Sequence, residues 1–145
     1  MNVITVQPMR VEFASEGVMK IEKIAAGVGI IMFNAAAKLA AGIHVLRGES
    51  VGQTPKNPAY FADTGIAYMI EQFKQKGITP PFLIAVAGGS SLLAMSDSAK
   101  AGSTIVPIVM NFFKDNDLSV KVEETGGNKV RNMLFNIDER KIKIV

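Results

Sequence analysis

His44 is the only histidine in a chain of 145 residues that contains no cysteine. An imidazole can take up and return a proton near neutral pH, and in many enzymes it activates a serine or cysteine nucleophile. The remaining candidates for a nucleophile are Ser90 and Ser91, which follow a Gly-Gly pair, and Asp63 could orient the imidazole. The chemistry open to this chain is therefore acid–base or serine-dependent chemistry, without any thiol.

Each of these residues also has a simpler structural interpretation. In the segment AGGSS, residues 87–91, the serines can hydrogen-bond the local backbone, and no Gly-x-Ser-x-Gly motif supports a hydrolase. A single histidine without cysteine or closely spaced carboxylates predicts no metal site. The segment TGGNK, residues 125–129, lacks the spacing of a phosphate-binding loop. We therefore expect neither a metal nor a cofactor.

The composition indicates a folded domain without a membrane span or a nucleic-acid-binding surface. A hydrophobic content of 48% is enough for a core, and the basic residues behind the net charge of +3 are scattered. Their densest group, within residues 140–143, alternates with isoleucine as in a solvated strand. The first 20 residues lack the apolar run of a secretory signal, and the uncharged residues 77–96 are interrupted by proline and glycine. We expect one domain, residues 1–145, in the cytoplasm.

Alternating and continuous apolar runs predict the strands. Residues 18–34 predict two strands around an Ala-Ala-Gly corner at residues 25–27, and residues 39–46 predict a third. On this third strand His44 lies on the face opposite the apolar row, because successive side chains alternate. Further strands are expected over residues 82–87, which should be covered on both faces, and over residues 118–123, 130–137 and 141–145.

Two other segments show helical spacing. Residues 58–76 predict an amphipathic helix that Gly77 ends. Residues 105–113 predict a second helix with Ser103 or Thr104 as its N-cap, because Pro107 is tolerated in a first turn. The order of elements is typical of an α+β sandwich, in which two main helices pack on a mixed, largely antiparallel sheet.

Five segments carry a resemblance to a known family. They are IEKIAAGVGIIMFN (21–34), AAGIHVL (40–46), AYFADTG (59–65), AVAGGSS (85–91) and EETGGNKVR (123–131). In this order they resemble CheD, the bacterial chemotaxis family that deamidates glutamine side chains of chemoreceptors. The resemblance covers residues 18–145 and implies a CheD-like fold.

The resemblance also implies a catalytic set, of which this chain holds only one member. In the family a cysteine attacks the amide carbonyl, a histidine moves protons and a threonine steadies the histidine. His44 matches the histidine, whereas Gly27 stands at the cysteine position and Ile21 at the threonine position. Glycine has no side-chain atom that could attack, and isoleucine cannot hydrogen-bond an imidazole. We therefore interpret His44 as a relic of the family's catalytic site.

The function that we expect is that of a catalytically inactive CheD-like chemotaxis protein. By resemblance, its partners would be chemoreceptor cytoplasmic helices or a CheC-like phosphatase, bound near Gly27 and His44. The alternative is residual glutamine deamidase activity, an amidohydrolase reaction in which His44 activates a water molecule, Ser90 or Ser91. A scaffold for an unrelated partner is a third class, and the sequence leaves the oligomeric state open.

Overall fold

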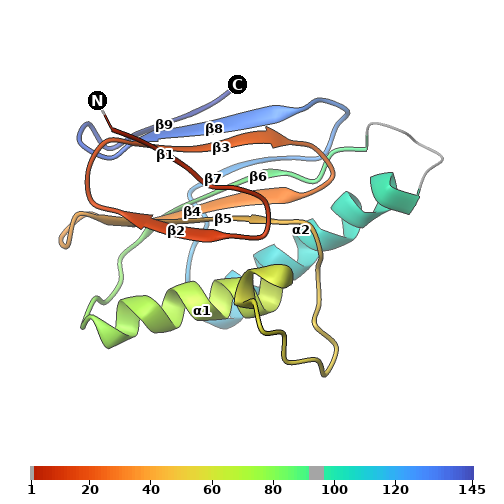
Figure 1. Ribbon diagram of the computed structural model, residues 1–145, viewed down its shortest axis with the longest axis horizontal. Helices are drawn as coiled ribbons and strands as arrows, with labels where there is room; N and C mark the ends of the chain where they lie inside the picture. The colour runs from red at the N-terminus through yellow and green to blue at the C-terminus, as the bar shows by residue number, and fades with distance from the viewer. Residues whose placement is uncertain (1, 92–96) are drawn as a thin grey trace.

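Two β-sheets pack face to face, and helices cover the outer face of one of them (Figure 1). The structure is a computed structural model that describes residues 2–91 and 97–145, without the side chains of residues 97–103. The four-stranded sheet has the order β1-β3-β8-β9, with β1 (Val3–Thr5), β3 (Val18–Ile24), β8 (Arg131–Asn136) and β9 (Lys141–Ile144). The five-stranded sheet has the order β2-β5-β4-β6-β7, with β2 (Val11–Ala14), β5 (Leu39–Val45), β4 (Val28–Asn34), β6 (Leu83–Gly88) and β7 (Val122–Thr125).

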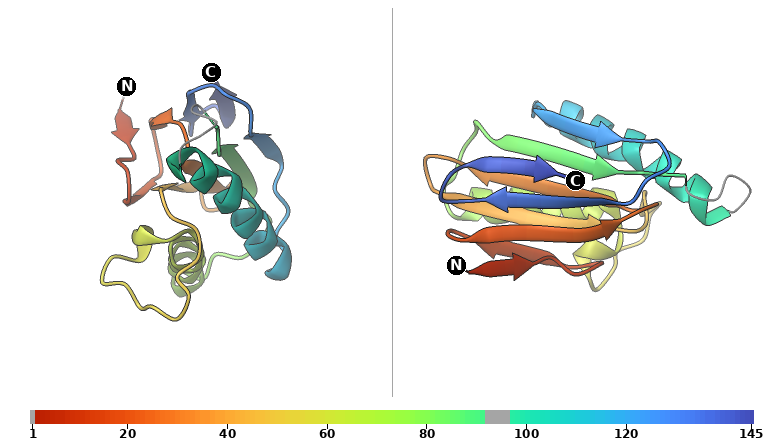
Figure 2. Two further views of the ribbon diagram at one scale, coloured as in Figure 1. Left: turned by 90° about the vertical axis from the view of Figure 1, so that its right-hand side faces the viewer. Right: turned by 90° about the horizontal axis from the view of Figure 1, so that it is seen from above.

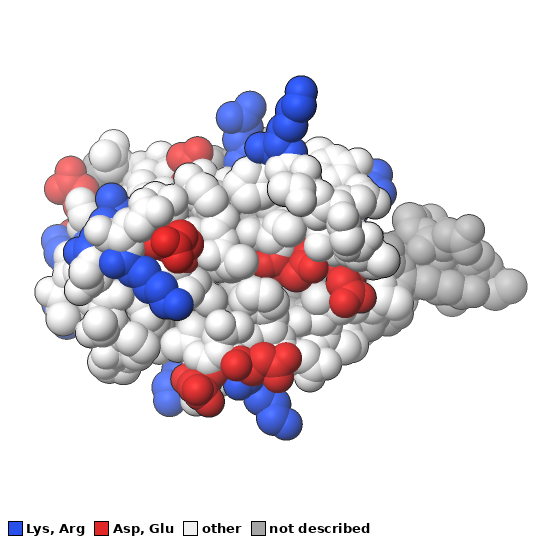
Figure 3. Space-filling model, turned by 90° about the horizontal axis from the view of Figure 1, so that it is seen from below, with Lys and Arg blue, Asp and Glu red and all other residues white. Residues whose placement is uncertain are grey.

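The helices α1 (Ala62–Gln75) and α2 (Asp97–Asp115) form the third layer, under the five-stranded sheet (Figure 2). A short 3-10 helix, η1 (Pro58–Tyr60), leads into α1. Gly77, with a φ of +72°, follows the end of α1. Seen from the helix side, charged side chains are scattered and separated by uncharged surface (Figure 3). None of the helices in the described residues is long and apolar enough to cross a membrane.

The five-stranded sheet takes part in two cores, because it is covered on both faces. In β6, Ile84 and Val86 pack in the core under the helices, while Ala85 and Ala87 pack in the core between the sheets. All residues of β4 are buried for the same reason. The prediction that residues 82–87 form a strand covered on both faces is thus confirmed, and its continuous apolar sequence follows from its place between two layers.

The predicted α+β sandwich with two main helices is confirmed, but the start of the second helix is not. We expected Ser103 or Thr104 to cap it; α2 instead begins at Asp97, so Pro107 lies inside the helix. Pro107 is exposed, and the stripe of Ile105, Val109 and Phe113 holds this part of α2 on the sheet. Tertiary packing therefore outweighs the hydrogen bond that proline cannot donate.

Two further differences concern strands. The sequence predicted none before residue 18, whereas β1 and β2 occupy one edge of each sheet. The strand predicted over residues 118–123 is displaced toward the C-terminus, because the chain first has to leave α2. Leu118 N–H donates to Phe113 O at 2.9 Å, and β7 then runs parallel to β6.

Truncation of Ile66 should test how far the helix layer stabilises the sandwich. Ile66 is fully buried on α1, so Ile66→Ala is expected to lower the free energy of unfolding by about 2–5 kcal/mol. Urea denaturation followed by circular dichroism measures the change. Glu71→Ala, on the exposed side of the same helix, serves as the control and should stay within about 0.5 kcal/mol of the wild type. Equal losses in both variants would contradict this assignment of the core.

Candidate functional site

The corner between β3 and β4 is tied to the end of β6 by backbone hydrogen bonds. Gly89 N–H donates to Gly27 O, and Ser90 N–H donates to Ala25 O, both at 2.9 Å. Gly88 has a φ of +119°, and a Cβ there would collide with Gly27 O. The small residues of both segments therefore meet a packing requirement, since two backbones touch where side chains would normally separate them.

Gly27 lies next to His44, as the family resemblance implied. A Cβ built on Gly27 would be 3.3 Å from His44 Nε2. The same atom would be 2.7 Å from Val45 O and 2.8 Å from Leu46 Cδ2, closer than a Cβ normally approaches. A side chain at this position would thus point at the imidazole, but only after β5 or the corner had moved.

His44 faces the interior between the two sheets. It lies directly opposite Gly29 of β4, and only 3% of its surface is exposed. The predicted orientation is confirmed, because a Cβ on Gly42, two residues earlier on the same face, would touch Met19 of the facing sheet. Its Nδ1 is buried without a hydrogen-bond partner, and burial lowers the pKa of the His44 imidazole below its usual value. The side chain is therefore neutral at pH 7.

Ile21 lies on the facing sheet, close to Gly29 and therefore near His44. A Cβ on Gly29 would lie 3.3 Å from Ile21 Cγ2, and Gly29 is the cross-strand neighbour of His44. Ile21 is itself fully buried and presents only methyl groups there. The structure therefore brings positions 21, 27 and 44 to one end of the sandwich, but two of the three carry no group that can form a hydrogen bond through its side chain.

The two serines and Asp63 form hydrogen bonds with residues other than those at positions 21, 27 and 44. Ser90 Oγ is fully buried and donates to Lys129 O at 2.6 Å, while Ser91 N–H donates to Gly127 O at 2.9 Å. Contrary to the prediction from the sequence, the Ser90 hydroxyl therefore does not bond the local backbone but joins the end of β6 to the backbone of Lys129. The Asp63 carboxylate accepts hydrogen bonds from Ser50 N–H and from Ser50 Oγ, the latter at 2.9 Å, near the start of α1.

Arg131 is a neighbour of this corner that the sequence did not reveal. Its side chain is buried with 4% exposed surface, and Nη1 donates to Ser90 Oγ at 2.9 Å and more weakly to Gly88 O at 3.4 Å. Nε is buried without a partner, and no carboxylate of the described residues forms an ion pair with the guanidinium. Arg131 thereby joins β8 to the end of β6. The sequence did offer one indication of its burial: Arg131 lies on the same face of a predicted strand as Met133 and Phe135.

The described residues contain no cluster of three histidine, aspartate or glutamate side chains that could hold a metal ion. They also show no hydrogen bond to the His44 imidazole that would orient it for proton transfer. The site therefore consists of a neutral, buried histidine facing a backbone corner, and the chemistry that its own side chains can support is limited to that imidazole.

Comparison with known proteins identifies the class to which this sandwich belongs. The family described as "CheD chemotactic sensory transduction" matches residues 45–145. Chemoreceptor glutamine deamidase CheD of Thermotoga maritima is 33% identical over 118 residues, which cover 81% of this chain and 74% of that protein. The chain belongs to the CheD family, as its motifs indicated, and its function lies in bacterial chemotaxis.

Other relatives extend the similarity. A probable chemoreceptor glutamine deamidase CheD of Clostridium botulinum is 30% identical over 122 residues, covering 81% of this chain and 75% of the relative. A protein of the same name from Caldanaerobacter subterraneus is 28% identical over 135 residues, covering 90% and 83%. The family match itself begins at residue 45, immediately after His44, and Gly27 lies outside it.

The buried imidazole should make stability depend on pH. The folded-state pKa of His44 is lowered, so protonation favours the unfolded chain, whose histidine pKa is about 6.5. This contribution is fully present above about pH 6.5 and is lost as the pH falls below that value toward the folded-state pKa. Urea denaturation between about pH 7.5 and 5.5 should show a falling free energy of unfolding. In His44→Gln this slope should be shallower; an unchanged slope would contradict the assignment.

Arg131 should stabilise the corner through its hydrogen bonds. Arg131→Ala removes the charged donor to Ser90 Oγ, so we expect a loss of about 1–3 kcal/mol in the free energy of unfolding. Arg131→Lys should recover only part of it, since an ammonium lacks the planar fork of donors. Lys141→Ala on exposed β9 is the control. The free energy of unfolding is measured by chemical denaturation. Equal values for the Arg131 variants and this control would show that the contacts contribute little.

Proposed function

We propose that this CheD-family protein is catalytically inactive and binds chemoreceptors without deamidating them. The observation that carries the proposal is the contact between Gly27 and His44. The position from which a side chain would face Nε2 at 3.3 Å holds only a hydrogen atom. A covalent deamidation needs a nucleophilic atom beside the base that activates it, and this pair offers the base alone.

Two further features argue against a direct attack by water. His44 is 3% exposed, so only a small part of its ring is open to solvent or to a glutamine side chain of a partner. Its Nδ1 has no partner that would hold the ring in one orientation or stabilise the imidazolium formed during proton transfer. Both roles normally require a polar neighbour, and Ile21 supplies none.

Residual serine-dependent deamidation is also disfavoured by the hydrogen bonds of Ser90. Its hydroxyl proton is donated to Lys129 O at 2.6 Å, and its oxygen accepts from Arg131. Activation by His44 would require these bonds to be exchanged for a contact with an imidazole on another strand. Ser90 therefore supports the fold of this corner and is not our candidate for a nucleophile.

The binding part of the proposal rests on what the chain shares with its relatives. Relatives named chemoreceptor glutamine deamidase match over 81% of this chain or more, although the nucleophile position is glycine here. Recognition uses a surface much larger than the three catalytic positions, so it can persist without chemistry. We propose the cytoplasmic helices of a chemoreceptor as the partner, which would place the protein in the cytoplasm, and a CheC-like phosphatase as a second partner.

The decisive experiment measures chemistry and binding on the same samples. Glutamine-bearing cytoplasmic fragments of a chemoreceptor are incubated with excess protein, and deamidation is followed by intact mass and ammonia release. The wild type should leave the receptor mass unchanged yet retain the fragment in a pull-down. Ile21→Thr combined with Gly27→Cys should gain measurable deamidation, because it restores a nucleophile and a hydrogen-bonding neighbour for His44. Gly27→Ser, equally crowded at Cβ, is the matched control and should stay far less active.

The outcomes separate the two halves of the proposal. Deamidation by the wild type would disprove inactivity, and His44→Ala would then show whether the imidazole is responsible. Failure to retain either the receptor fragment or a CheC-like protein would disprove the binding role, whatever the variants do. Because a side chain at position 27 presses on Val45 O, each variant is first checked for folding by circular dichroism.

A further inference from the structure

The strand β2 leaves one edge of the five-stranded sheet open. It pairs antiparallel with β5 alone. Met9 N–H donates to His44 O at 2.7 Å, so the backbone of β5 at His44, and again at Gly42, is directed toward β2. Glu12, which is paired with Gly42, therefore faces β5, whereas Val11 and Phe13 direct their N–H and C=O groups away from the sheet.

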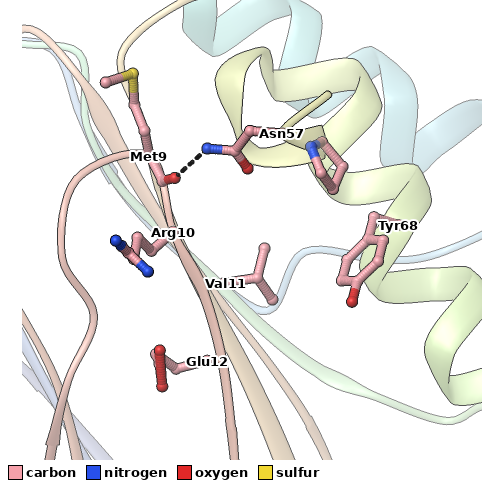
Figure 4. A pocket seen from close by; sticks show the side chains of 7 residues that line it. Met9, Arg10, Val11, Glu12, Asn57 and Tyr68 are labelled. Carbon is pink, nitrogen blue, oxygen red and sulfur yellow. Dashed lines mark hydrogen bonds between the residues drawn. The ribbon is translucent and has the colours of Figure 1, made fainter. Parts of the chain in front are cut away.

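A cleft of about 360 Å³ runs along this edge, between β2 and α1 (Figure 4). Asn57 Nδ2 donates to Met9 O at 2.9 Å and closes the cleft at one end of the strand. Val11 projects toward Tyr68 of α1, whose side chain is 39% exposed, while Arg10 and Glu12 project from the other face of β2. The open edge thus combines unpaired backbone groups, the side chain of Val11 and two charges.

The two charges are unpaired in the part of the chain that the structure describes. Neither Arg10 nor Glu12 takes part in an ion pair there. In an antiparallel pair, the order Arg-Val-Glu is its own complement: with Val11 opposite Val11, Arg10 of each strand meets Glu12 of the other. We propose that β2 pairs with β2 of a second copy about a twofold axis at Val11, which joins the two five-stranded sheets.

This register satisfies backbone and side chains together. A twofold axis at Val11 lets the outward N–H and C=O of the two Val11 residues bond each other. Moving the axis to Glu12 would pair Val11 with Phe13 of the second copy but place Glu12 against Glu12, a like-charge contact that disfavours pairing. Charges on edge strands commonly prevent such association, but they do so when like charges meet, and this order brings opposite charges together. The axis also brings the two Tyr68-lined clefts together, as a self-complementary interface requires.

Sedimentation velocity at low salt, from micromolar to millimolar protein, tests the proposal with three charge variants. The wild type should shift from monomer to dimer as its concentration rises. Arg10→Glu and Glu12→Arg each turn both cross-strand pairs into like-charge pairs, so each should weaken dimerisation by about tenfold or more. The double swap Arg10→Glu with Glu12→Arg has the same charges in reverse order and should dimerise as the wild type does.

The rescue by the double swap separates pairing from a loss of stability, which would persist when both sites are changed. Hydrogen exchange adds a local reading: protection of the Val11 amide should rise with protein concentration in the wild type and in the double swap. A wild type that stays monomeric throughout would overturn the proposal, even if extended peptides bound to the same edge. Dimerisation unaffected by the single changes, or lost in the double swap, would also overturn it.

Discussion

Two backbone segments, residues 25–27 and 88–90, touch at one end of the sandwich, and this contact determines which side chains the site can hold. Gly27 O lies so close to Gly88 that no side chain fits on Gly88, and Val45 O leaves no room at Gly27 without movement. The hydrogen bond between Gly89 and Gly27 O fixes this distance, and the buried guanidinium of Arg131 holds the end of β6 from the other sheet. The corner is thus closely packed at Gly27, the position at which the family's reaction, as the resemblance implies, would need a side chain.

The sequence predicted those parts of the fold that depend on local periodicity. The apolar rows of β4, β5 and α1 and the orientation of His44 follow from alternation or helical spacing, and the structure confirms them. β1 and β2 were missed because strands of 3 and 4 residues are too short for a clear pattern and are fixed by pairing with β3 and β5. Arg131 was missed because its burial depends on contacts with residues 88–90, more than forty positions away.

The site itself shows the limit of reasoning from residue types. The resemblance to CheD placed positions 21, 27 and 44 in one site, and the structure brings them to one end of the sandwich. Only the three-dimensional structure shows that the imidazole is buried with an unpaired Nδ1, because this burial depends on packing between two sheets. Such a group is costly to keep, because a buried polar atom without a partner loses its hydration. His44 is therefore not explained by stability, and its interpretation as a relic of a catalytic site stays a prediction.

Membership of the family and retention of its chemistry are separate properties of this chain. The fold depends on the two cores and the hydrogen-bonded corner, whereas the family's reaction, as the resemblance implies, would depend on three side chains at one end of the sandwich. Ile21 and Gly27 leave no unpaired side-chain polar atom of their own in this region, so the absence of polar side chains at these two positions costs the cores little. Recognition of a partner would use a surface much larger than these three positions, so the proposed loss of catalysis does not require a loss of binding.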